Sequence, residues 1–424
     1  MLNRTQAPAF RQVNNIKFIP PVKQQLANGI DVFILNIGEQ DLVRIEFIFE
    51  NVNWDASKPL LAMAVNGLIN SGTASLSAKE IADKIDYYGA FLQTDFSSDY
   101  TNVTLFTLTK HLNAVLPVVY DILNNSIFPQ EELDIYKQNQ KQRLQVNLQK
   151  NDFLGRKTFA HAIFGNTPYG INVEMADYDE LKREELLTHY QSAYQPKNCV
   201  IIVSGKFVNK DFEVLDQIFG KSWKNEGPFE KNKLSFVAQD GQEIYVEKPD
   251  ALQSAIRMGN LAIDRKHPDF PSLQVLNCVL GGYFGSRLMA NIREDKGYTY
   301  GIGSAVASLK QAGYFFIATE VGADVCADAL KEIEKEITLL KTEPISEEEL
   351  DLVRNYMLGS MLGSLENAFS HADKFKNIYF SGMDYDYYSR YIDTVKTITP
   401  AQLMNIANKY LNSDQMIKVV IGKK

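Results

Sequence analysis

The sequence predicts an α+β fold, with mixed α and β elements, built from two copies of one domain. The chain has 424 residues, 45% hydrophobic and 23% charged, which is enough for two or three domains with their own cores. Segments with the period-2 pattern of strands alternate with segments of helical period. Similar segments also recur at one fixed spacing of about 217 residues, which indicates an internal duplication.

The repeat rests on segments that occur in the same order in each half. The runs YQPKNCVIIVSGKF (194–207) and YLNSDQMIKVVIGKK (410–424) both place a tyrosine before a polar turn and a β-branched run that ends at glycine. The acidic segments FPQEELDIYK and PISEEELDLVRN share the same spacing, and each follows an apolar strand pattern and a helical pattern. Strand, helix, acidic helix start and terminal strand are therefore predicted twice.

Individual elements follow from local patterns. The alternation of apolar residues over 43–49 predicts a strand. Ser77 and Glu80 have the spacing of a capping box and predict a helix start, and Ser346 and Glu349 repeat that pattern in the second half. We expect a helix to follow each of these boxes.

A polar segment with weak periodicity separates the two halves. Residues 226–242 include Gly227, Pro228 and Gly241, which are typical of a loop. The predicted organisation is therefore a first domain over 1–225, this linker, and a second domain over 243–424.

Composition excludes several classes of partner. The formal charge is −8, from 44 Lys and Arg against 52 Asp and Glu, which has the wrong sign for a nucleic-acid binder. No run of about 18 apolar residues occurs, so we expect no membrane span. The absence of an apolar leader and the three unpaired, widely spaced cysteines favour the cytoplasm, with the periplasm as the alternative.

No familiar catalytic motif is present. The five histidines are scattered, so no two imidazoles share one helix face at a spacing of four residues, and no metal site is predicted. The chain has no G-x-S-x-G or phosphate-binding loop. Gly281, Gly282 and Gly285 in LGGYFGSRL do not match a dinucleotide motif, and they predict a tight turn with close backbone approach.

The most distinctive stretch is SRLMANIREDKGYTYGIGS, residues 286–304. Arg293 and Tyr300 lie on either side of the turn signal 295–297, between an apolar helical segment and a strand that we expect to begin at Tyr298. Such a corner can aim a guanidinium and a phenol at one acceptor, for example a peptide carbonyl. From these residues alone, the alternative is structural: Arg293 paired with a local acid and Tyr300 on a sheet face.

Together, the LGG-x-F-x-SRL…IRE-x-KGYTYGIGS segment, the TPYG of 167–170, the YQPKNCVIIVSG run and the duplication resemble the M16 family of zinc metallopeptidases, which includes pitrilysin, insulinase and mitochondrial processing peptidase. The resemblance implies two similar domains, each a mostly antiparallel sheet covered by helices. Two such pairs would close around a chamber that holds an extended peptide. It also implies that Arg293 and Tyr300, which match a family pair in type and spacing, bind substrate backbone.

The family's zinc motif is degenerate in this chain. Active members hold zinc with H-x-x-E-H and a more distant Glu; aligned on the Gly-Thr pair at 72–73, the three motif positions fall on Met63, Asn66 and Gly67. The distant position falls near Leu144 or Gln145, and residues 135–151 contain no acid. Because zinc needs three protein ligands and the catalytic water needs a base, we expect no metal or cofactor in this chain and no peptide hydrolysis by it alone.

The resemblance therefore implies a non-catalytic, substrate-binding subunit of a heterodimeric M16-type zinc metallopeptidase. A zinc-bearing homologue would be the partner, and an extended peptide would be held by Arg293, Tyr300 and the turn containing Gly281, Gly282 and Gly285. This turn takes the place of the glycine-rich loop in the α subunit of mitochondrial processing peptidase, but it is much shorter. The alternatives are a structural core subunit and a peptide-binding homologue without protease activity.

Overall fold

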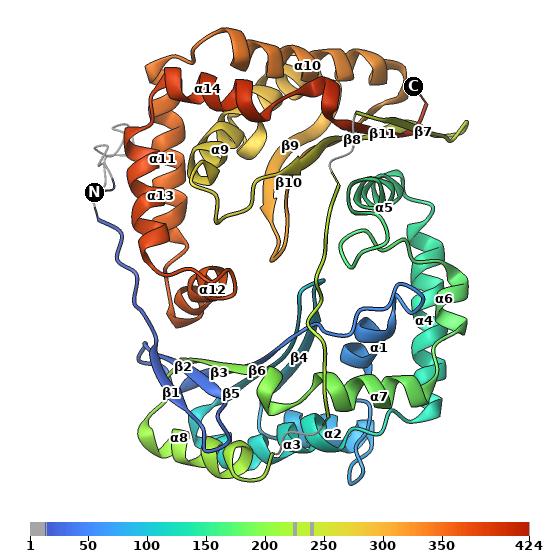
Figure 1. The fold of residues 1–424 in the computed structure, drawn as a ribbon, viewed down its shortest axis with the longest axis vertical. Helices are drawn as coiled ribbons and strands as arrows, with labels where there is room; N and C mark the ends of the chain where they lie inside the picture. The colour runs from blue at the N-terminus through green and yellow to red at the C-terminus, as the bar shows by residue number, and fades with distance from the viewer. Residues whose placement is uncertain (1–12, 14, 224–226, 238–240, 424) are drawn as a thin grey trace, which may run out of the picture.

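A computed structural model describes residues 13, 15–223, 227–237 and 241–423. The predicted junction between residues 225 and 226 lies outside the described residues, as do residues 1–12, on which the predicted compartment partly depends. The N-terminal half and the C-terminal half each contain a sheet with helices on it, and the segment after residue 227 crosses from one half to the other (Figure 1).

The first half is built on a six-stranded sheet within the described residues, in the order β1-β2-β6-β3-β5-β4. The strands are β1 Val22–Gln25, β2 Asp31–Asn36, β3 Leu42–Glu50, β4 Phe91–Phe96, β5 Tyr100–Leu108 and β6 Cys199–Gly205. β2 pairs with β6 in parallel, and the other neighbours are antiparallel. Strand β3 contains the predicted alternation over 43–49.

The second half repeats this topology. Its strands, in the order β7-β11-β8-β10-β9, are β7 Glu243–Glu247, β8 Gln253–Ala262, β9 Thr299–Ser308, β10 Gly313–Gly322 and β11 Ile417–Gly422. Apart from β1, which has no counterpart among the described strands of the second sheet, the two orders are the same: β7, β11, β8, β10 and β9 take the places of β2, β6, β3, β5 and β4. β7 and β11 are again the parallel pair. The predicted duplicated α+β fold is thus confirmed.

The helices occupy the segments between these strands. In the first half they are α1 Leu61–Leu68, α2 Ala78–Tyr87, α3 Leu112–Asn125, α4 Gln130–Asn147, α5 Asn151–Phe164, α6 Met175–Asp179, α7 Arg183–Ala193 and α8 Asn209–Leu215. In the second they are α9 Phe270–Asn277, α10 Cys326–Thr342, α11 Glu347–Gly363, α12 Ala368–Tyr379, α13 Asp386–Thr397 and α14 Pro400–Tyr410. Within the described residues, none of these helices is long and apolar enough to cross a membrane.

Only one of the two predicted capping boxes is complete. Ser77 and Glu80 cap α2 reciprocally, as predicted. Ser346 accepts from the backbone N–H of Glu349 at the start of α11, but the carboxylate of Glu349 accepts two hydrogen bonds from Arg287, each 2.8 Å long. The second capping box is therefore wrong in one of its two hydrogen bonds: the Glu349 carboxylate binds Arg287 instead of the backbone N–H of Ser346.

Each sheet has one face covered by helices of its own half and the other by a helix of the opposite half. Helix α5 packs on β8 and β11 of the second sheet, and α12 packs on β2 and β6 of the first (Figure 1). These two contacts form separate hydrophobic clusters. One contains Phe159, Ile163 and Phe164 with Ala255, Ile417, Val419 and Ile421, and the other contains Phe33, Leu35, Ile48 and Ile202 with Ala372 and Phe375.

A charged residue of each sheet pairs with the helix from the opposite half. Glu46 of β3 lies beside Ile202, is 3% exposed, and forms an ion pair with Lys376 of α12 at 2.5 Å. Arg257 lies at the matching position of β8, beside Val419, and pairs with an aspartate of α5 at 2.9 Å. The duplication therefore places a charge at the same register position in both sheets, with opposite sign.

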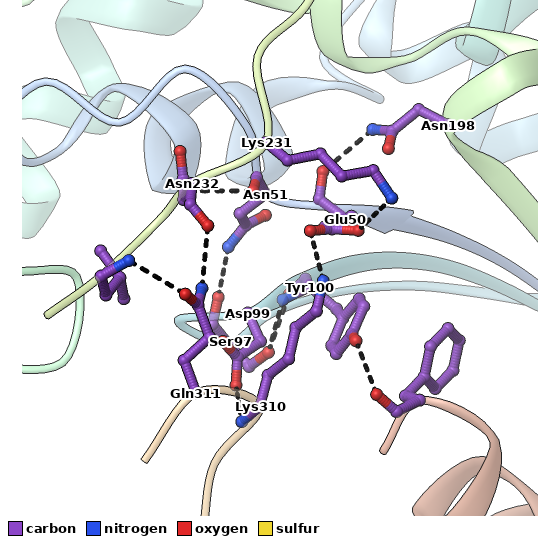
Figure 2. A network of polar contacts seen from close by, with 12 residues as sticks. Glu50, Asn51, Ser97, Asp99, Tyr100, Asn198, Lys231, Asn232, Lys310 and Gln311 are labelled. Carbon is purple, nitrogen blue, oxygen red and sulfur yellow. Dashed lines mark hydrogen bonds and ion pairs between the residues drawn. The ribbon is translucent and has the colours of Figure 1, made fainter. Parts of the chain in front are cut away.

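Polar contacts join the halves at the tip of the β9–β10 hairpin (Figure 2). The backbone N–H of Lys310 donates to Asp99 at 3.0 Å, and its ammonium forms an ion pair with Glu50. Gln311 donates to the carbonyl of Asn232 at 3.0 Å, and Asn232 donates in turn to the carbonyl of residue 51. The segment between the halves therefore participates in the contact that orients them.

We expect Glu46→Gln to lower the free energy of unfolding by about 2–4 kcal/mol, because the 8%-exposed Arg44 loses the carboxylate 3.0 Å away and keeps only Asp373, and Lys376 also loses its pairing with Glu46. Urea denaturation followed by circular dichroism measures this change. Asp83→Asn, which breaks the solvent-exposed pair with Lys79, is the control and should leave the midpoint unchanged. Equal midpoints for the two variants would contradict a stabilising role for the buried charges.

Candidate functional site

The degenerate zinc positions lie on α1, which is packed as a structural helix. Asn66 is 2% exposed, and its amide donates to the carbonyl of Asn102 at 3.3 Å and to the hydroxyl of Tyr194 at 3.2 Å. Burial raises the pKa of the Tyr194 phenol to about 12. The position of the family's general base thus holds an amide whose donors are satisfied inside the core.

The other three positions are equally unsuited to a metal. Met63 is partly buried against the first core, and a Cβ on Gly67 would lie 3.0 Å from the ring of Tyr136 on α4. Leu144 is buried and Gln145 is exposed. In the part of the chain that the structure describes, no group of three His, Cys, Asp or Glu side chains could hold a metal ion. The residues present do not fit a zinc ion.

The predicted helix–turn–strand corner is present in the second half. Leu288, Met289 and Ile292 are buried, and the helical turns over Met289–Asp295, with π-type hydrogen bonding, end at the predicted turn. Gly297 has a φ of 66°, which glycine adopts without strain. Strand β9 begins at Thr299, one residue later than predicted, because the N–H of residue 298 is bonded to the carbonyl of Ile292.

Tyr300 lies at the surface, and Arg293 is half-buried. Tyr300 is 92% exposed, and the guanidinium carbon of Arg293 lies 4.5 Å from the centroid of the Phe284 ring. Among the described residues, no carboxylate lies within 4.0 Å of the Arg293 guanidinium, so the alternative in which a local acid pairs with it is wrong. The guanidinium of Arg293 and the phenol of Tyr300 are thus two hydrogen-bond donors, and the guanidinium has no carboxylate acceptor among the described residues.

The glycine turn has a steric explanation. A Cβ on Gly281 would lie 2.7 Å from the backbone nitrogen of Ser304 on β9, and one on Gly282 would lie 3.0 Å from the amide of Asn277. A Cβ on Gly285 would lie 2.8 Å from the ring of Tyr283. Gly281 therefore allows the predicted close backbone approach to β9, whereas Gly282 and Gly285 make room for Asn277 and Tyr283 of their own segment.

Phe284 is a candidate site residue that sequence reasoning did not single out. It is 64% exposed, and its only sequence signal is an aromatic residue between two glycine positions. The structure brings it to Arg293 through the turn, nine residues away along the chain. The guanidinium and the turn thus form one surface feature, whereas the degenerate zinc positions lie in the other half.

A cavity of about 1130 Å³ lies at the start of β8, lined by the first turn of α5, the β7–β8 turn and Glu320. Glu320 lies where the register of β10 against β9 shifts, and its carbonyl accepts from the hydroxyl of Thr299 at 2.6 Å. Tyr300 follows Thr299 directly. Tyr300 therefore lies near the end of β9 that is bonded to Glu320, away from the hairpin tip that contacts the first half.

His189 of α7 lies beside α1 in a small pocket that also includes Leu61 and Trp54. It is 7% exposed, and burial lowers its pKa to about 4. The imidazole of His189 is therefore neutral in the folded protein at pH 7. Its surroundings are those of a core histidine, as expected for a lone histidine in this chain.

Comparisons with known proteins agree with this fold. Residues 180–357 match the family described as the peptidase M16 inactive domain. The chain is 27% identical over 304 residues to the uncharacterized zinc protease YmxG of Bacillus subtilis, covering 70% of this chain and 72% of that protein. It is 23% identical over 382 residues to the non-peptidase homolog YmxG of Helicobacter pylori, covering 86% and 84%.

Among solved structures, the M16 inactive domain from Pseudomonas fluorescens superposes with a TM-score of 0.86 at 22% identity, covering 96% of this chain and 99% of that one. The chain is thus a homologue of the M16 peptidases, as the sequence predicts. Within that class it resembles proteins named as inactive or non-peptidase members.

We expect Gly281→Ala to lower the thermal midpoint by several degrees, corresponding to about 1–3 kcal/mol, because the new methyl must displace the backbone of β9. Differential scanning fluorimetry measures the shift. The matched control is Gly359→Ala in the exposed middle of α11, where the methyl meets nothing within 4 Å and helix propensity favours alanine. A Gly281 variant as stable as the control would contradict the close-approach explanation.

Stability should fall on acidification below pH 6.5 because of His189. The unfolded histidine binds a proton near pH 6.5 and the folded one only near 4, so the unfolded state holds more protons between these values. The full loss amounts to about 3 kcal/mol. Urea titrations at pH 7 and pH 5 should show a smaller decrease for His189→Gln than for the unchanged chain; equal decreases would assign the pH dependence to other groups.

Proposed function

We propose that this chain is the non-catalytic, substrate-binding subunit of a two-subunit M16-type peptidase, and that a zinc-bearing homologue is its partner. One combination of features carries the proposal. The same chain carries an exposed Tyr300 and a half-buried Arg293 whose guanidinium has no internal acid, while its zinc-motif positions hold Met63, Asn66 and Gly67. In this proposal the second half keeps a peptide-binding surface, and the first half lacks the hydrolytic groups.

The chemistry of the pair suits an extended peptide. A guanidinium presents several N–H donors in one plane, and a phenol presents one O–H donor. Both can donate to main-chain carbonyls, which recur along an extended strand independently of side-chain identity. Edge strand β9, on which Tyr300 lies, has an unpaired side in the described sheet and can align such a peptide. Binding by this surface would orient the substrate toward the partner.

The partner is needed because this chain offers no base or metal ligand at the family's positions. Arg293 and Tyr300 would contribute orientation and, as charge develops on the carbonyl oxygen, electrostatic stabilisation. We further propose that the domains extend over 1–225 and 243–424. The end of β6 at Gly205 and the start of β7 at Glu243 support this division. The three buried free cysteines support a cytoplasmic location.

A second candidate is a peptide-binding homologue that acts without any protease. The name of the Helicobacter pylori relative, a non-peptidase homolog, favours it. A purely structural core subunit agrees less well with the exposed Tyr300, because side chains used only for packing would be buried. Copurification from a native lysate followed by a protease assay with and without a chelator separates the candidates.

With the partner present, we expect Arg293→Ala to lower the rate of peptide cleavage by about one to three orders of magnitude, because an oriented donor is lost. Steady-state kinetics on a quenched fluorescent peptide measures this effect. Arg390→Ala, an exposed arginine on α13 of the same half, is the matched control and should leave the rate unchanged. Equal rates for both variants would overturn the role assigned to Arg293.

A further inference from the structure

Phe284 and Arg293 form a cation–π pair in the second half. The guanidinium carbon lies 4.5 Å from the ring centroid, within the range of a cation–π contact. Phe284 is 64% exposed although it is a large apolar residue. An aromatic ring left in solvent beside an arginine without an acid calls for an explanation beyond packing of the core.

The turn that carries Phe284 is held firmly on both sides. The preceding Tyr283 packs on Tyr356 of α11, with ring centroids 4.8 Å apart. The following Ser286 is fully buried, and its N–H donates to the carbonyl of Tyr283 at 3.1 Å. Next in the chain, Arg287 is fixed by its paired hydrogen bonds to Glu349. The backbone that carries Phe284 is therefore held in place by anchored neighbours.

The ring of Phe284 lies against the guanidinium, whose N–H donors lie in its own plane and can still reach an acceptor. An arginine side chain in water populates many rotamers, and fixing it on binding costs conformational entropy. The ring limits this freedom before a ligand arrives, and the N–H donors still lack an internal carboxylate acceptor among the described residues. The arrangement presents a preorganised donor edge.

We propose that Phe284 is a positioning residue that holds the Arg293 guanidinium ready to donate hydrogen bonds to the main-chain carbonyls of an extended peptide. The inference rests on the proposed function for its ligand. Phe284 acts through Arg293: it supplies the aromatic face, and the arginine supplies the donors. A leucine at 284 keeps an apolar side chain in the turn but removes the π face, whereas a tyrosine keeps the π face.

The first experiment needs no partner and no peptide. Phenylglyoxal modifies accessible guanidinium groups, and peptide mapping by mass spectrometry gives the rate at Arg293, with exposed Arg390 as the internal reference. We expect Phe284→Leu to raise the Arg293 rate about threefold relative to Arg390, and Phe284→Tyr to leave it unchanged. Unchanged rates in Phe284→Leu would overturn the positioning role irrespective of what the chain binds.

The second experiment is a double-mutant cycle on peptide affinity. The probe is a fluorescein-labelled, proline-free synthetic peptide without net charge, and fluorescence anisotropy gives its Kd for the full chain. We expect Phe284→Leu to weaken binding about three- to tenfold in the unchanged background and to have no effect when Arg293 is already alanine. Phe284→Tyr should retain the affinity.

The outcomes distinguish a failure of the positioning role of Phe284 from a failure of the proposed function. Equal losses from Phe284→Leu in both backgrounds would overturn the inference, because the ring would then contact the peptide directly. Binding that is insensitive to Arg293→Ala would overturn the proposed function, and the phenylglyoxal rates would still decide whether Phe284 positions the arginine. Circular dichroism of each variant confirms that the measured differences come from folded protein.

Discussion

The architecture depends on the exchange of helices α5 and α12 between the two halves. A sheet in the middle of a domain has two faces, and an uncovered apolar face would lie in water at a cost that grows with its area. Each half covers one face of its sheet with its own helices, and the other face is covered by the helix from the opposite half. Neither half could bury both faces of its sheet alone, so the two halves are expected to fold as a unit.

This exchange also determines how the candidate site is presented. Because α5 packs against β8 and β11, it fixes the second sheet relative to the first half, and the β9–β10 tip adds polar contacts at Lys310 and Gln311. Strand β9 is thereby held at its tip, and its other end, with Tyr300, is bonded to Glu320 of β10 through Thr299. A rigid scaffold supports the exposed Tyr300 and the half-buried Arg293, which suits orientation of a ligand.

The sequence predicted the class of fold and the repeat because both depend on patterns that repetition reinforces: apolar alternation, helical period and terminal glycines at one spacing. It also predicted the corner at Gly297 from turn chemistry. It could not predict the contact of Phe284 with Arg293, since the partners are joined by a turn whose shape depends on Ser304 and Tyr356. The sequence also could not predict that Arg287 binds Glu349, because the two residues are far apart along the chain and meet only in the folded protein.

Helix α1 keeps its place in the fold although its residues at the zinc-motif positions are not metal ligands. In the first half, Asn66 and Gly67 contribute to packing: the amide bonds Asn102 and Tyr194, and the ring of Tyr136 lies against the glycine. A zinc ligand at Gly67 would have to displace that ring. The binding role proposed for the second half would make no such demand on the core, because Tyr300 is exposed and Arg293 is half-buried beside a surface turn. The packing of α1 therefore restricts which side chains fit at residue 67, whereas the Arg293 corner lies outside the core.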